Sequence, residues 1–583
     1  MKDFVKMTLA VICGFLIMGI LLAVISFSFI GAVVAIGSTT PALPSSGALV
    51  IDLSQVNIGE QSSESNPLAS FTGKDDGAIS IYDAVEAVKT AAYDPTVKFI
   101  YLKTDNATTG VSYMEELRSA LADFRTDSGK PIVAYTEAPS TGSYYMASVA
   151  DKVYMTPFLG ATIPFNGITT QSVFLGDLLK KFGVNVQLIR HGKYKSAGEM
   201  YTRSSSSPEN REQYQRLVDS MWETLGPQIA ESRGLEQKDL DAYIDNLELS
   251  TPQDFVRCGL VDELLDRNAL EEKLAVLGMA DDFKSLSMIS FADYVANQTA
   301  AAAKKQNIAI IYADGNIIDG SVKEQVAGDR FAALIGKVCD DSSIDAVVLR
   351  VNSPGGSVLA SEKIKNELDR LKSTKPLVAS YGSYAASGGY WISNNCEYIF
   401  SDATTLTGSI GVFGIVPDFS KTAKDVLHVG VESISSHKHG DMYGVMRPFD
   451  QNEYAYMTAS IEGIYDKFVN IVSEGRSLDK ERVDALGQGR VWTGADALTN
   501  GLVDEIGGLT DAVNFVAGMI DDPDFEAHGI VTYPKPAGQL EKILSMFGVS
   551  GDDEDWSGRI AKVLGIEEGP KILARMDTQI EVR

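Results

Sequence analysis

The chain of 583 residues contains an internal repeat, and this repeat restricts its fold more than any other feature. The matching positions are Lys130–Tyr135 with Lys375–Ser380, Gly110 with Gly355 and Tyr145 with Tyr390, all 245 residues apart, and Gly259–Glu263 with Gly501–Glu505. Agreement at several sites with one spacing indicates an ancient tandem duplication. We therefore expect two similar domains, which also suits a chain too long for one hydrophobic core.

Short apolar runs alternate with helical patterns in each half of the chain. In the second half, Ile308–Tyr312, Ala346–Val351 and Leu377–Ser380 are typical of buried strands. Strands that alternate with helices predict βαβ units and a mainly parallel sheet. Because ligands of such sheets bind where loops leave the carboxyl ends of the strands, Pro354–Gly356 and Ser383–Ser387 are expected at one functional edge.

The N-terminal segment predicts a membrane anchor. Residues 8–36 contain no charged residue, and about 20 apolar residues suffice to span a bilayer. The run is longer than the apolar region of a cleavable signal peptide, which favours a retained single-pass helix. Lys2 and Lys6 precede it and no basic residue follows before Lys74, so we expect a cytoplasmic N-terminus and a body outside the bacterial inner membrane, in the periplasm.

These observations divide the chain into six segments. We expect an anchor at 1–36, a linker at 37–47, a first repeat at 48–296, a joint at 297–306, a second repeat at 307–520 and a C-terminal extension at 521–583.

Charge and ligand-forming residues exclude several classes of protein. The formal net charge of −27 argues against nucleic acid as a partner, because phosphate binding needs clustered Lys and Arg. The four cysteines are scattered without a CxxC pair, so no disulfide framework is expected. His437 and His439 lack the spacing of a metal site. We expect neither a metal nor another cofactor.

Ser387 is the first candidate for chemistry. It follows a predicted strand, lies beside Gly388 and Gly389, and precedes a helical pattern. A serine at a helix N-terminus lies at the positive end of the helix dipole, which would stabilise an alkoxide. A serine in this position is equally typical of a simple N-cap, and the local pattern leaves both readings open.

Gly355 and Gly356 also lie between a strand and a helix. Their N–H groups are unobstructed and could hold an oxyanion, a role worth about 3–4 kcal/mol per donor in other enzymes. A phosphate cradle is disfavoured because neither GxxxxGK[ST] nor GxGxxG is present, whereas a plain tight turn stays open.

A serine nucleophile needs a base, and no histidine lies in a convincing triad context. A lysine can serve where burial lowers its pKa toward neutrality. Lys195 and Lys438 are the candidates, and the residues alone do not decide between them.

Five motifs together resemble the long, duplicated form of the signal peptide peptidase A family. They are Tyr194–Ala197, Asn352–Ser357, Ala385–Trp391, Thr407–Gly411 and Gly489–Gly494. The resemblance implies two tandem α/β domains similar to the ClpP/crotonase superfamily and a Ser/Lys dyad. It makes Ser387 the nucleophile, Lys195 the general base and Ser409 the residue that orients the lysine. Gly355 and Gly356 take the oxyanion position.

The same resemblance implies a membrane-bound, bowl-shaped homotetramer in which the dyad is shared between neighbouring protomers. Its substrates would be apolar peptides such as cleaved signal peptides. At the spacing of 245 residues Ser387 corresponds to Gly142 and Ser409 to Pro164, so the first repeat lacks a nucleophile. Two alternatives remain: an acyl-CoA-processing crotonase-like enzyme that uses Gly355 and Gly356, and a non-catalytic membrane scaffold.

Overall fold

The computed structural model describes residues 6–8, 14, 18, 42–62, 77–160, 162–301, 305–323, 325–520, 528–535 and 572–576. The predicted anchor lies almost wholly outside these residues. Among the residues that are described, no helix is both long and apolar enough to cross a bilayer.

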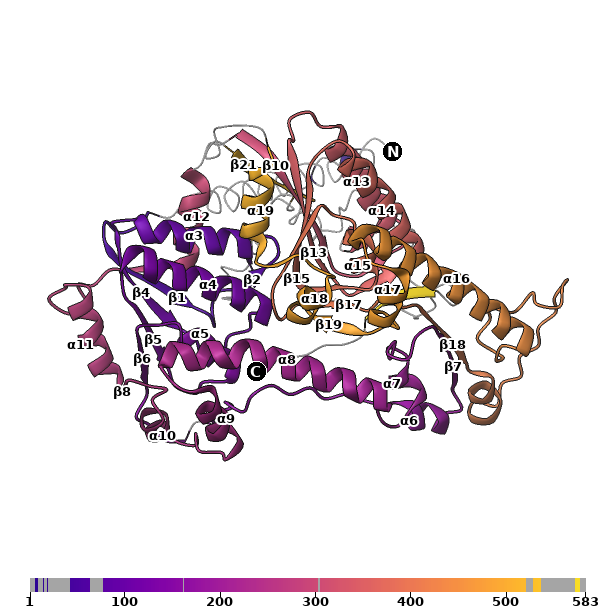
Figure 1. The fold of residues 1–583 in the computed structure, drawn as a ribbon, viewed down its shortest axis with the longest axis horizontal. Coiled ribbons are helices and arrows are strands. Elements are labelled where there is room, and N and C mark those ends of the chain that lie inside the picture. Colours follow the sequence, from indigo (N-terminus) through magenta and orange to yellow (C-terminus); the bar gives the residue numbers. More distant parts are fainter. Residues whose placement is uncertain are drawn as a thin grey trace.

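Each half of the chain forms a mainly parallel sheet flanked by helices (Figure 1). In the first sheet the strands lie in the order β8 (Glu263–Leu264), β6 (Lys152–Met155), β5 (Ile132–Thr136), β4 (Val97–Lys103), β1 (Gly47–Asp52) and β9 (Met288–Ser290). In the second sheet, six of the eight strands lie in the order β20 (Glu505–Ile506), β16 (Tyr398–Ser401), β15 (Leu377–Ala386), β13 (Ala346–Ser353), β10 (Lys305–Asp314) and β21 (His528–Tyr533), and β17 (Leu406–Gly408) and β19 (Val491–Thr493) extend the sheet from the end of β15. The two orders are the same, which confirms the predicted tandem α/β architecture.

Matching hydrogen bonds refine the alignment of the repeats. Tyr144 Oη donates to Leu260 O in the first repeat, and Tyr390 Oη donates to Leu502 O in the second. Tyr144 and not Tyr145 is therefore the counterpart of Tyr390, so the spacing has grown from 245 to 246 residues. This places Thr141, not Gly142, opposite Ser387. The spacing between the repeats is not constant, because the segment between the strand (β5 or β15) and the helix that follows it differs in length by one residue.

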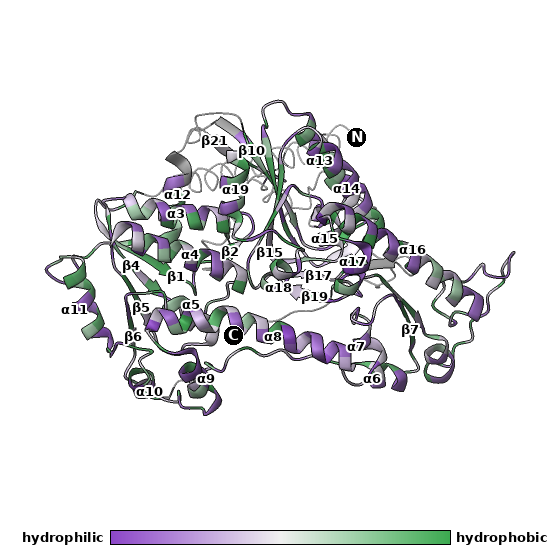
Figure 2. Cartoon of the chain, in the orientation of Figure 1, coloured by the Kyte–Doolittle hydropathy of each residue, from purple (hydrophilic) through white to green (hydrophobic). Residues whose placement is uncertain are grey.

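The second sheet packs on both faces because its side chains alternate. Ile308, Ile310 and Tyr312 of β10 join a core shared broadly with the first repeat, whereas Ala309 and Ile311 face a core that the second repeat forms with Ile189 of the first. Helices α13 (Gly328–Asp340) and α14 (Val358–Lys372) cover that second core, and Figure 2 shows hydrophilic residues along both. The repeats are thus packed into one body by a common core.

A buried charged cluster joins the repeats at that common core. The guanidinium of Arg350, on β13, donates to Glu60 at 2.7 Å and to Glu116 at 2.7 Å, and all three side chains are buried. Glu116 lies on α4 (Val111–Ser128) of the first repeat. Burial raises the pKa of Glu60 and of Glu116, and Arg350 opposes that rise.

A third sheet crosses from one repeat to the other. Its strands lie in the order β12 (Val326–Ala327), β11 (Ile317–Ile318), β14 (Gly355–Ser357), β22 (Ile572–Arg575), β18 (Phe413–Asp418) and β7 (Asn185–Arg190). Strand β7 belongs to the first repeat and pairs antiparallel with β18 of the second, from Phe413 opposite Arg190 to Asp418 opposite Asn185. Helix α8 (Pro208–Arg233) then runs back along the molecule toward α5 (Thr141–Ala147), as Figure 1 shows.

Candidate active site

Ser387 lies between the end of β15 and the start of α15 (Gly388–Ser393). Its backbone has φ 53° and ψ −110°, a conformation that non-glycine residues rarely adopt and that collects at functional sites. Its N–H donates to Gly408 O at 2.8 Å, and its carbonyl accepts from Trp391 N. The side chain makes no capping hydrogen bond, so the N-cap reading does not account for this serine.

Lys195 reaches Ser387 from the first repeat. The pairing of β7 with β18 carries the following segment across, and the Lys195 side chain is buried, with 1% of its surface exposed. Its Nζ lies 2.8 Å from Ser387 Oγ. It also lies 3.0 Å from Ser409 Oγ and 3.1 Å from Ser409 O. The structure therefore brings together the three residues that the motifs singled out.

The lysine segment is fixed on both sides. Arg190 Nη1 donates to Lys195 O at 2.7 Å and to the buried carboxylate of Glu199 at 3.2 Å. On the other side, Tyr194 N donates to Gln488 O. Gly489, at φ 76°, lies so close that an added Cβ would be 2.4 Å from Lys195 Cβ. The motif that begins at Gly489 thus forms the backbone against which the lysine packs.

Three glycine backbones converge beside Ser387. Gly355 has φ 97°, and a Cβ added to it would lie 2.5 Å from Gly388 N. A Cβ added to Gly388 would lie 3.0 Å from Gly356 N. Gly388 is the first residue of α15, where helix N–H groups lack partners within the helix. We did not predict Gly388 from the sequence, although a glycine directly after a nucleophile at a helix start is a signal that could have found it.

A peptide strand of the chain itself lies in the groove next to this site. Strand β22 pairs antiparallel with β14, so that Gly355 faces Arg575 and Gly356 faces Ala574, and it pairs with β18 on its other side. Met576 N donates to Pro354 O at 2.7 Å. Ala574 is fully buried and Met576 nearly so. The groove between β14 and β18 therefore accommodates an extended peptide.

The remaining candidates lie elsewhere. Lys438 is exposed and belongs to the segment after β18. His439 lies near Asp450 and Glu453, but Glu453 already accepts from Arg447 and caps the helix α16 (Gln451–Arg476).

The contact between Lys195 and Ser387 forms within one chain. This corrects the expectation that the pair is completed by neighbouring protomers. The reason is the crossing of residues 185–207, which carry the lysine of the first repeat onto the second repeat of the same chain.

A fully buried serine hydroxyl in contact with a lysine amine, between two α/β repeats and beside a bound peptide strand, defines a hydrolase of the serine type. The family model "Peptidase family S49" matches residues 125–280 and 369–519, one region in each repeat. The chain belongs to this family and is a serine peptidase.

Curated relatives support the assignment over most of the chain. Protease 4 of Haemophilus influenzae is 36% identical over 532 residues, which cover 88% of this chain and 84% of the relative. Protease 4 of Salmonella typhi is 35% identical over 488 residues, or 80% and 77%. Serine protease SPPA, chloroplastic, of Arabidopsis thaliana is 30% identical over 511 residues, or 86% and 74%. The solved structure of ClpP1 from Listeria monocytogenes matches 35% of this chain and 92% of its own length at 16% identity, with a TM-score of 0.22.

Proposed function

We propose that the chain is an endopeptidase in which Ser387 is the nucleophile and Lys195 is the general base. The observation that carries the proposal is the 2.8 Å contact between Lys195 Nζ and Ser387 Oγ in a site without water-exposed surface. As neutral amine, Lys195 takes the hydroxyl proton while Ser387 Oγ attacks the peptide carbonyl carbon. The same proton then passes to the leaving amine, and an ester between the peptide and Ser387 remains. Water hydrolyses this ester while Lys195 takes a proton from the water and returns it to Ser387 Oγ.

Ser409 orients the base in this proposal. Its hydroxyl lies 3.0 Å and its carbonyl 3.1 Å from Lys195 Nζ, so both contacts can hold the amine beside Ser387. The N–H groups of Gly356 and Gly388 are the proposed donors to the carbonyl oxygen as it gains negative charge, because a Cβ added to Gly388 would lie 3.0 Å from Gly356 N. The N–H of Gly355 donates to Ser353 Oγ at 3.2 Å, so Gly355 contributes its close backbone approach to Gly388 and not a free donor.

The substrate would be an extended apolar peptide, such as a cleaved signal peptide. The position of β22 supports this choice, because an incoming peptide could form the same antiparallel pairing with β14. The buried side chains of Ala574 and Met576 indicate that the flanking positions suit small or apolar residues.

Substitution of the dyad tests the mechanism. Ser387→Ala and Lys195→Ala should each lower kcat/KM for an apolar fluorogenic peptide by about 10⁴-fold or more, as in other serine peptidases, with an unchanged thermal unfolding profile. A serine-directed phosphonate should label the wild-type protein at Ser387. Normal turnover by either variant would refute the dyad, and a failure of labelling would favour a crotonase-like reaction without a serine nucleophile.

The proposed location is the bacterial inner membrane, with the catalytic body in the periplasm as part of a homotetramer. The uncharged run at residues 8–36 supports an anchor, and the acidic body is compatible with a soluble exterior. Membrane fractionation of the full chain against a version that begins at residue 42 checks the anchor. Light scattering of the detergent-solubilised full chain checks the assembly.

A further inference from the structure

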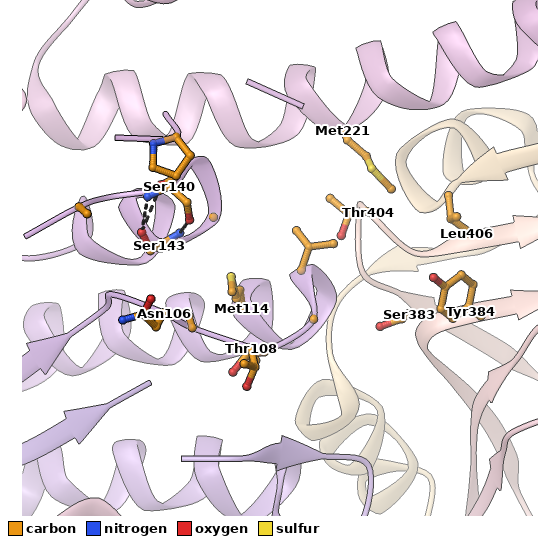
Figure 3. A pocket seen from close by; sticks show the side chains of 17 residues that line it. Asn106, Thr108, Met114, Ser140, Ser143, Met221, Ser383, Tyr384, Thr404 and Leu406 are labelled. Atoms are coloured by element: carbon orange, nitrogen blue, oxygen red, sulfur yellow. Dashed lines mark hydrogen bonds between the residues drawn. The ribbon is translucent and has the colours of Figure 1, made fainter. Parts of the chain in front are cut away.

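A large cavity lies in the first repeat at the position that the active site occupies in the second. Its volume is about 490 Å³. Figure 3 shows Met221 of α8 above it, Ser383, Tyr384 and Leu406 on the side of the second repeat, and Asn106, Thr108, Ser140 and Ser143 on the side of the first. The cavity thus lies at the boundary between the repeats, and residues of the second repeat form one of its walls.

The lining of the cavity corresponds to the active site by duplication. Gly142 lines it and, at the spacing of 246 residues, is the counterpart of Gly388, whereas Gly110 lines it as the N-cap of α4, the place that Ser357 takes in α14. Pro164 also lines it, directly after Ile163, which is the counterpart of Ser409 at the spacing of 246 residues. The second repeat holds a peptide strand, β22, beside its own active site.

The cavity cannot perform the same chemistry. Thr141, the counterpart of Ser387, is fully buried and its hydroxyl donates to Gly167 O at 2.9 Å. It does not line the cavity, and Ile163 offers no hydroxyl in the place of Ser409. The cavity of the first repeat therefore has no nucleophile, and its remaining possible role is binding.

The cavity and the groove that holds β22 share two side chains. Met576, just beyond β22, is buried in a cluster with Met221 and Leu406, and both of these residues also line the cavity. Tyr384 packs against the same cluster. Since Tyr384 precedes Ser387 by three residues of extended chain, the cavity wall begins about 10 Å from the nucleophile.

We propose that this cavity is a distal subsite that binds the stretch of the substrate peptide on the C-terminal side of the groove. A peptide that follows the direction of β22 passes Met221 and Leu406 and then enters the cavity. Met114 and Met221 give it adaptable apolar walls, and the hydroxyl and amide groups at its edge can pair with a peptide main chain. The inference rests on the proposed peptidase function and adds a length preference to it.

Two fluorogenic peptides with the same cleavage sequence test the subsite. One ends two residues after the scissile bond, and the other continues for six further apolar residues. Thr108→Trp and Ala138→Trp add bulk to the cavity at residues whose side chains are not fully buried. Each should raise KM for the long peptide by about tenfold, the value of one lost apolar contact, and should leave kcat and the short peptide unchanged.

Thr126→Trp is the matched control, because Thr126 is an exposed threonine at the far end of α4. It should behave as the wild type with both peptides. Equal KM values for the long peptide in wild type and Thr108→Trp, or equal losses with both peptides, would overturn the subsite while the peptidase function stood. A wild-type protein that cleaves neither peptide would instead refute the proposed function.

Discussion

Ser387 and Ser409 both adopt positive φ values, 53° and 50°, and both make contacts with the same lysine amine. Ser409→Ala should leave the backbone strain unchanged while it removes the hydroxyl 3.0 Å from Lys195 Nζ. We expect kcat to fall by about 10–100-fold with little change in KM, because the lost contact orients the base and does not bind substrate. Steady-state kinetics at several pH values measures this. A change confined to KM would show that Ser409 contacts the substrate instead.

Gly489 offers a second test at the residue scale. Gly489→Ala forces a Cβ into the Lys195 main chain and should displace the amine, so we expect a loss of activity of more than about 100-fold. Gly501→Ala is the matched control, since Gly501 has nearly the same φ, 79°, but its nearest neighbour is Leu478 Cδ2 at 3.9 Å. Gly501→Ala should lose about 1–2 kcal/mol of unfolding free energy from the left-handed backbone, and Gly489→Ala should lose more because the clash with Lys195 adds to that cost. Equal activity of the two would contradict the steric role of Gly489.

Helix α4 connects the repeats through Glu115. Its carboxylate accepts from the backbone N–H groups of Ala403 at 2.9 Å and Thr404 at 3.0 Å, in the loop that leads to β17 (Leu406–Gly408) and on to Ser409. Burial raises the pKa of the Glu115 carboxyl to about 7. In the unfolded chain this carboxyl has its ordinary pKa of about 4.5. Between pH 4.5 and pH 7 the folded state therefore binds more protons than the unfolded state. The unfolding free energy should therefore fall as pH rises from about 4.5 to about 7.

Glu115→Gln tests this pH dependence, because glutamine resembles the protonated carboxyl. The decrease of Tm between pH 5 and pH 8 should be smaller in the variant than in the wild type, and differential scanning fluorimetry across that range measures it. Part of the decrease should remain, because burial also raises the pKa of Asp402 and Glu116 nearby. Glu272→Gln, at an exposed glutamate of α11 (Arg267–Leu277), should follow the wild-type curve. Parallel curves for Glu115→Gln and wild type would contradict the assignment.

At the scale of elements, the strands and motifs that depend on nearby residues could be predicted from the sequence. The apolar runs gave β10, β13 and β15 and their parallel pairing, and the five motifs predicted residues that the structure brings together around Ser387. The pairing of β7 with β18 and of β22 with β14 was not predictable, because such registers depend on contacts between segments more than 150 residues apart in the sequence. The shift from Gly142 to Thr141 was missed for a similar reason. A one-residue change in a loop is visible only through the hydrogen bonds that follow it.

At the scale of the whole molecule, the two repeats supply different parts of one active site, and a single chain contains all of these parts. The first repeat supplies the lysine, the bridging helix α8 and most of the cavity, whereas the second supplies both serines and the groove. Arg216 of α8 pairs with Asp496 of the second repeat at 2.8 Å, which adds to the common core in holding the two together. The duplication has therefore become necessary for one active site, and neither repeat should be active alone.

Co-expression of two inactive variants distinguishes an active site formed within one chain from an active site formed between two chains. Ser387→Ala and Lys195→Ala would be co-expressed with different tags, and complexes that contain both would be isolated by sequential affinity steps. Because Lys195 contacts Ser387 of its own chain, every site in these mixed complexes lacks one member of the dyad. We expect no more peptidase activity than either variant shows alone. A dyad shared between protomers would instead restore about a quarter of wild-type activity by random pairing, and that result would reinstate the site between protomers. If no mixed complex can be isolated, the homotetramer is refuted, while the site within one chain is unaffected.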